Sequence, residues 1–121
     1  MKDPMEFEIE FYETAEGRCP VREFLDEIKA AAPDDFAAIL AGLTKLKRRE
    51  YHRPPLSKPV AHGIYELRYL GRLSARVFYF FAQGRRIVLV HGIIKKGQRI
   101  PKRHIDLALS RKEEWGQRHA R

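Results

Sequence analysis

The sequence predicts an α+β domain in which helices cover a curved, mainly antiparallel four-stranded sheet, in the order β-α-α-β-β-β-α. Apolar residues alternate with a period of two near the start and again over residues 64–94, as in half-buried strands. Between residues 20 and 50 the apolar period is 3.6, as in helices. The later strands are separated by short connections that contain Gly71 and Gln83-Gly84, and such connections favour an antiparallel meander. A chain of 121 residues suits one core, so residues 1–121 are expected to form a single domain.

The first half of the chain predicts one strand and a helical hairpin. Phe7, Ile9 and Phe11 alternate with glutamates, which predicts a half-buried strand within residues 5–12. Pro20 suits a first helical position, where the missing N–H is not needed, and a helix over 20–32 is expected. A second helix is expected over 35–50, because acidic residues lie at its start and basic residues near its end, where each interacts favourably with the helix dipole.

The second half predicts three strands and a last helix. Prolines 54, 55 and 59 exclude a helix and predict a loop. Strands are expected at Ile64–Leu70, Ala75–Ala82 and Arg86–Ile94. Pro101 then opens a helix that is expected to extend to about Trp115.

Positive charge is concentrated in the second half. The formal net charge is +8, but residues 1–50 hold 8 Lys/Arg against 12 Asp/Glu, whereas residues 51–121 hold 16 against 4. A domain polarised in this way attracts polyanions to one part of its surface. Nucleic acid, a ribosome or an acidic protein partner would fit, and a solvated basic surface without a ligand is the alternative.

The sequence favours a cytoplasmic protein without a metal site. Cys19 is the single cysteine, so no internal disulfide is possible, and no Cys/His spacing suggests zinc. The first residues lack the apolar centre of a signal peptide, and no apolar run approaches the roughly 18 residues that span a membrane. No membrane association and no cofactor are expected.

One carboxylate lies within a basic stretch. Residues 51–105 contain 12 Lys/Arg and one acid, Glu66. Glu66 and Arg68 are expected on the sheet face opposite the core side chains Tyr65 and Leu67. RNA scission requires a base for the ribose 2′-hydroxyl, cations for the phosphorane and an acid for the leaving oxygen. The candidate catalytic residues are Glu66, Arg68, Arg76, His91 and Lys96, and the candidate RNA-binding residues are Lys58, Arg72, Lys95, Arg99 and Lys102.

Structural interpretations of the same residues stay open. Glu66 can form a plain cross-strand ion pair with Arg68 or serve as the carboxylate partner of Arg76, and His91 can be a hydrogen-bonded structural histidine. Lys95-Lys96 also fits a solvated turn. The aromatic residues between 65 and 81 are mostly expected in the core, with one or two available to stack on bases.

The order of the motifs adds a resemblance. It is carried by Gly63-Ile64-Tyr65-Glu66-Leu67-Arg68, Ala75-Arg76-Val77-Phe78-Tyr79, and Val88-Leu89-Val90-His91-Gly92 leading to Lys95-Lys96. Together these segments resemble the phage-derived HigB-like branch of the RelE/ParE toxin superfamily. The resemblance extends from about Phe7 to Arg111. It departs where relatives continue the paired lysines with threonine, since residues 97–101 read Gly-Gln-Arg-Ile-Pro.

The resemblance implies a RelE-like fold and the toxin of a type II toxin–antitoxin system. Such toxins are metal-independent endoribonucleases that cut messenger RNA on the ribosome, and a cognate antitoxin, commonly of the helix-turn-helix type, neutralises them. It implies phosphate binding by Arg68 and Arg76, and basic side chains at Lys95 and Lys96. The role of Glu66 as base, and of His91 or Lys96 as proton donor, is inferred from chemistry. A ParE-like gyrase inhibitor and a non-catalytic phage-derived nucleic-acid-binding protein are the alternatives.

Overall fold

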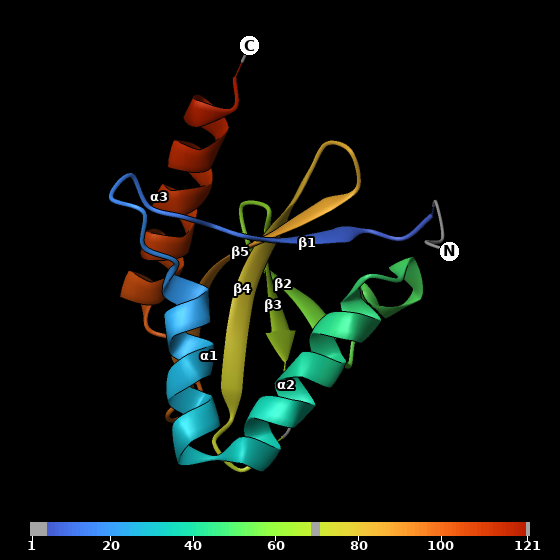
Figure 1. The fold of residues 1–121 in the computed structure, drawn as a ribbon, viewed down its shortest axis with the longest axis vertical. Helices are drawn as coiled ribbons and strands as arrows, with labels where there is room; N and C mark the ends of the chain where they lie inside the picture. Colours follow the sequence, from blue (N-terminus) through green and yellow to red (C-terminus); the bar gives the residue numbers. More distant parts are fainter. Residues whose placement is uncertain (1–4, 69–70, 121) are drawn as a thin grey trace.

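The computed structural model describes residues 5–68 and 71–120, in which three α-helices cover a five-stranded mixed sheet (Figure 1). The prediction of an α+β fold is confirmed at this level. The elements follow the order β1 (Glu8–Phe11), α1 (Pro20–Ala31), α2 (Pro33–Leu46), the 3-10 helix η1 (Arg49–Tyr51), β2 (Ser57–Ala61), β3 (Ile64–Arg68), β4 (Ala75–Ala82), β5 (Arg86–Ile94) and α3 (Lys102–Arg118).

The sheet has the strand order β1-β5-β4-β3-β2. β5, β4, β3 and β2 pair antiparallel with their neighbours, as the short connections predict. β1 pairs parallel with β5, with Ile9 opposite Ile87. A parallel pair needs a long crossover, and here the helices and the meander together make it.

The prediction of four strands was wrong, because the segment expected to be a loop contains β2. Proline excludes a helix there, but it does not exclude an edge strand, where one N–H faces solvent instead of a neighbouring strand. β2 is such an edge, with Pro59 opposite Tyr65 and a register shift between Pro59 and Ala61.

Alternation along the strands divides the core between the two faces of the sheet. Leu67, Val77 and Tyr79 belong to the cluster beneath α1 and α2. Phe78 and Phe80 belong to the cluster beneath α3. Nearly every residue of β4 is buried because this strand is covered on both faces. Consequently, any polar side chain on β4 requires a partner.

The other boundaries differ little from expectation. The helix expected over 35–50 ends at Leu46, and a 3-10 turn follows it. The last helix continues beyond Trp115 to Arg118. The end of the strand expected at residues 64–70 lies outside the described residues. In the part of the chain that the structure describes, no helix has the length and apolar character needed to cross a bilayer.

Candidate functional site

Strand register brings basic residues from distant parts of the chain to one end of the sheet. Arg68 of β3 lies opposite Arg76 of β4, and Arg76 lies opposite Ile93 of β5. Just beyond, the N–H of Lys95 donates to the carbonyl of Ser74 at 3.0 Å. The β3–β4 connection and the segment after β5 are therefore neighbours. We call this region the basic end of the sheet, and its residues are Arg68, Arg72, Arg76, Lys95 and Lys96.

A buried carboxylate on α2 holds the β3–β4 connection. Asp35 is only 3% exposed, and its Oδ2 accepts a hydrogen bond of 3.0 Å from the N–H of Leu73. Figure 1 shows residues 71–74 of this connection beside the junction of α1 and α2. Arg72, which is exposed, sits next to this anchor. Asp35 thereby links the start of α2 to the basic end of the sheet.

Glu66 and Arg76 form a buried ion pair. The Nε–H of Arg76 donates to Oε1 of Glu66 at 2.9 Å, and each residue is 6% exposed. The guanidinium also donates to the carbonyls of Ser74 and Ala75, each at 3.2 Å. The pair satisfies two charges that would be costly if buried alone. In the free protein these contacts favour the structural interpretation of Glu66.

Arg68 is placed differently from its neighbour. Its backbone N–H donates to Leu56 at 2.7 Å, and its side chain is half-buried. The guanidinium forms no ion pair with any residue that the structure describes. Of the two paired arginines on β3 and β4, Arg68 is therefore more accessible than Arg76.

A row of paired residues crosses the sheet on the α3 side. Lys58 pairs with Glu66, Glu66 with Phe78, and Phe78 with His91. The Phe78 ring stacks on the His91 ring at 5.9 Å between centroids. Glu66 and His91 therefore flank the same aromatic ring, one strand away from it on either side.

His91 is part of a hydrogen-bonded chain with α3. Nη1 of Arg111 lies 3.4 Å from Nδ1 of His91, and Nε2 of His91 lies 2.9 Å from Nδ1 of His104. Since arginine can only donate, Nδ1 of His91 accepts and its Nε2–H donates to His104. Burial, Arg111 and His104 lower the pKa of His91 to about 4. Burial and Arg103 also lower the pKa of His104.

A cavity of about 430 Å³ opens at the end of β5. We call it the β5 cavity. Gly92 and Phe24 line it, and an added Cβ at Gly92 would overlap the ring of Phe24, so α1 packs directly against the strand. Polar side chains of α1, β5, the segment after β5 and α3 line it, namely Glu27, His91, Lys95, Lys96, Arg103 and His104.

The predicted residues thus form two groups. Glu66, Arg68 and Arg76 meet on β3 and β4, whereas His91, Lys95 and Lys96 line the β5 cavity. The remaining predicted residues, Lys58, Arg72, Arg99 and Lys102, are exposed, and Lys102 pairs with Asp106 at 2.9 Å.

Sequence analysis missed Asp35, Arg103, His104 and Arg111. The interval of seven residues between His104 and Arg111 places both on one face of a helix, which was a detectable signal. The sequence does not show that this face of the helix packs against β5, because that contact forms only in the folded protein. Among residues 5–68 and 71–120, no three His, Cys, Asp or Glu side chains gather as metal ligands would.

Comparison with known families identifies the chain. Residues 23–113 match the model of the family described as phage-derived protein Gp49-like (DUF891). The chain therefore belongs to this phage-derived family, which is associated with toxins of toxin–antitoxin systems of the RelE/HigB type. No curated protein matches the chain.

Proposed function

We propose that this protein is the toxin of a type II toxin–antitoxin system and cleaves messenger RNA on the ribosome. The observation that supports this most is the basic end of the sheet, where register and one backbone hydrogen bond gather cations from three segments. Membership of a toxin-associated family agrees with it. A cognate antitoxin, expected to be of the helix-turn-helix type, and a cytoplasmic location complete the proposal.

In this proposal Arg68, Lys95 and Lys96 bind the scissile phosphate. Arg68 has no ion-pair partner among the described residues, Lys95 is half-buried, and Lys96 is exposed. Cations that are already positioned stabilise the charge of the phosphorane without reorganising, which is how a site without a metal can cleave RNA.

Glu66 acts as the base through an exchange of partners. In the free protein its carboxylate is held by Arg76. An incoming phosphate competes for this guanidinium, and a released carboxylate can take the 2′-hydroxyl proton. The O2′ atom then attacks phosphorus, the P–O5′ bond breaks, and a 2′,3′-cyclic phosphate results. Catalytic hydrogen bonds commonly form only in the substrate complex.

Lys96 is the proton donor of this scheme. His91 was an equal candidate from sequence, but its pKa of about 4 keeps the imidazole neutral near pH 7. Both of its ring nitrogens are also engaged, by Arg111 and His104. His91 is therefore assigned to positioning α3 against β5.

Inducible expression tests the proposal. We expect the wild type to halt growth, with protein synthesis failing before DNA synthesis and with new transcript ends appearing within coding regions. Lys95→Ala/Lys96→Ala should relieve growth arrest, whereas Lys47→Ala, an exposed lysine at the far end of α2, should not.

DNA synthesis failing first would identify a gyrase inhibitor instead. Unchanged transcript ends with preserved RNA binding would identify a non-catalytic nucleic-acid-binding protein. Either result would overturn the proposed activity.

A further inference from the structure

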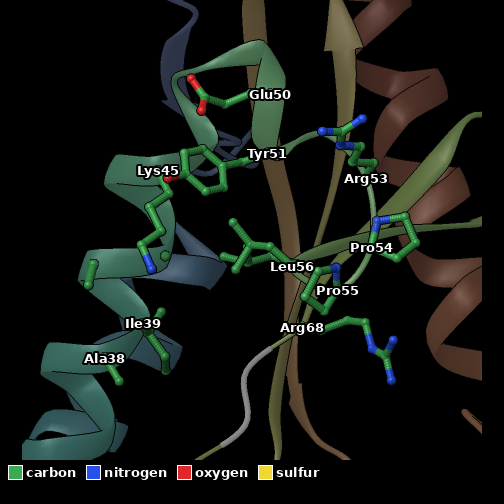
Figure 2. Close-up of a pocket in the computed structure, with 13 residues that line it drawn as sticks. Ala38, Ile39, Lys45, Glu50, Tyr51, Arg53, Pro54, Pro55, Leu56 and Arg68 are labelled. Carbon is green, nitrogen blue, oxygen red and sulfur yellow. The ribbon is translucent and has the colours of Figure 1, made fainter.

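A second cavity, larger than the β5 cavity, lies elsewhere on the described part of the chain. It occupies about 620 Å³ between α2, the segment 50–56 and the end of β3 (Figure 2). We call it the α2 cavity. Small-molecule and anchor pockets of proteins typically measure about 300–1,000 Å³. An engineered cavity of about 150 Å³ accepts a benzene ring, so the α2 cavity has room for more than one apolar side chain.

The inner surface of the α2 cavity is apolar. Figure 2 shows Leu56 and Ile39 on its two sides, from the loop and from α2 respectively. Gly42 contributes no side chain, and an added Cβ would contact Leu56 and Leu67 at an ordinary 3.7 Å. The remaining uncharged lining residues are Ala38, Ala41, Tyr51, Pro54, Pro55 and Leu67. Such a surface recognises apolar side chains better than the polar edges of nucleic-acid bases.

The rim of the cavity is positively charged. Lys45, Arg53 and Arg68 line it, and within residues 5–68 and 71–120 none of them pairs with a carboxylate. The one acid of the lining, Glu50, is already paired with Arg48 at 3.0 Å. An apolar floor with cations above it is complementary to apolar side chains flanked by carboxylates.

We propose that the α2 cavity binds an acidic amphipathic helical segment of a partner protein. Helices bind in grooves through apolar side chains at i, i+3, i+4 and i+7. The face of α2 that lines the cavity has the same spacing, with Ala38, Ala41, Gly42 and Lys45. The small side chains let a second helix approach α2, and its glutamates would meet the rim. This binding does not depend on RNA cleavage.

Synthetic peptides test this surface on the complete chain. The first peptide has leucines at i, i+3, i+4 and i+7 and glutamates at the other positions. A second has lysines in place of the glutamates, and a third has serines in place of the leucines. A short uridine oligonucleotide tests RNA at the same site. Binding is measured by calorimetry and by NMR shifts of the amides of Gly42 and Leu56.

The glutamate peptide alone should shift these amides. Gly42→Leu, which fills the cavity, should weaken its binding at least tenfold, whereas Gly116→Leu should not, because position 116 of α3 faces open space. Lys45→Glu/Arg53→Glu should reverse the preference in favour of the lysine peptide. Unchanged melting temperatures would confirm that each variant is folded.

Three results would overturn the proposal. They are equal binding of the acidic and basic peptides, shifts located elsewhere on the chain, and binding of the uridine oligonucleotide that Gly42→Leu abolishes. The last result would make the α2 cavity an RNA subsite and would leave the proposed nuclease intact. Conversely, loss of cleavage with retained peptide binding would refute only the nuclease.

Discussion

Arg76 donates from Nε to Oε1 of Glu66 at 2.9 Å, and each side chain is only 8% exposed. The two residues lie on adjacent strands, diagonal to the direct pairs Glu66–Phe78 and Arg68–Arg76. Their charges compensate each other within the protein, so the loss of one partner leaves the other buried without its counter-charge. This relationship leads to the first prediction.

Removing either partner should destabilise the protein more than removing both. Glu66→Leu or Arg76→Met alone should lower the free energy of unfolding by about 3–5 kcal/mol. The first leaves the Arg76 guanidinium buried without its carboxylate, and the second leaves the Glu66 carboxylate buried without its guanidinium. The double variant should cost less than either single variant, and therefore less than their sum. Urea unfolding of the four proteins at pH 7 measures the coupling, and additivity within about 0.5 kcal/mol would contradict it.

The same variants test catalysis. If Arg76 binds the phosphate as proposed, Arg76→Met should lose about 10²–10³ in cleavage rate per folded molecule. A destabilised variant that still cleaves RNA at the wild-type rate would confine Arg76 to a structural role. The exchange of partners proposed for Glu66 would fail with it.

Asp35→Ala should lower the free energy of unfolding by about 1–3 kcal/mol, because the N–H of Leu73 loses its acceptor. Asp34→Ala is the matched control, since both acids lie in the first turn of α2 and only Asp34 is exposed. Each variant loses the same helix-dipole interaction, of about 0.3–1 kcal/mol. Equal unfolding midpoints in urea would show that the Asp35 hydrogen bond contributes nothing.

Gly92→Ala should destabilise by about 1–3 kcal/mol, because the new methyl group would overlap the Phe24 ring and force α1 away from β5. Phe24→Leu in the same chain should restore part of the loss. The control is Gly116→Ala on α3, where no atom lies within 4 Å. That change should stabilise by up to about 1 kcal/mol, since alanine favours helix. Thermal unfolding compares them, and a neutral Gly92→Ala would contradict the close packing.

His91 should titrate near pH 4 in an NMR pH series, because burial and Arg111 disfavour the imidazolium. Unfolded histidine titrates near about 6.5, so between pH 6.5 and 4 the unfolded chain binds a proton that the folded chain does not. The contribution of His91 to stability is therefore complete above about pH 6.5 and is lost as the pH falls towards 4. His91→Gln should make the urea midpoint less sensitive to pH in this window. A His91 titration near 6.5 would contradict the hydrogen-bonded chain.

Binding to single-stranded RNA should weaken linearly in log–log plots against salt, by roughly 0.7 per phosphate neutralised. Arg68→Ala should reduce this slope by about 0.7, because its guanidinium forms no ion pair with the described residues and is proposed to bind a phosphate. Lys47→Ala removes the same charge at the far end of α2 and should leave the slope unchanged. Fluorescence anisotropy between low and physiological salt measures both, and identical slopes for the two variants would remove Arg68 from the interface.

Sequence by itself determined the elements whose pattern is local. The 3.6 period after Pro20 and the alternation over residues 64–94 depend on side-chain direction within one segment. The observed bounds of α1, β4 and β5 therefore agree closely with the predicted ranges. The proline-containing strand β2 was not predicted. Proline excludes a helix from local geometry alone, but it is compatible with a strand when that strand lies at the edge of a sheet, which the local sequence does not show.

Tertiary structure decided how the charged residues are paired. The sequence placed Glu66 among cations and left Arg68 and Arg76 both open as its partner, and the tertiary structure pairs it with Arg76 and leaves Arg68 without an ion pair among the described residues. Likewise, His91 was an equal candidate for proton donor until the packing of α3 placed Arg111 and His104 against its two nitrogens. Periodicity is a property of neighbours along the chain, but burial and charge compensation arise between segments that meet only in the folded protein.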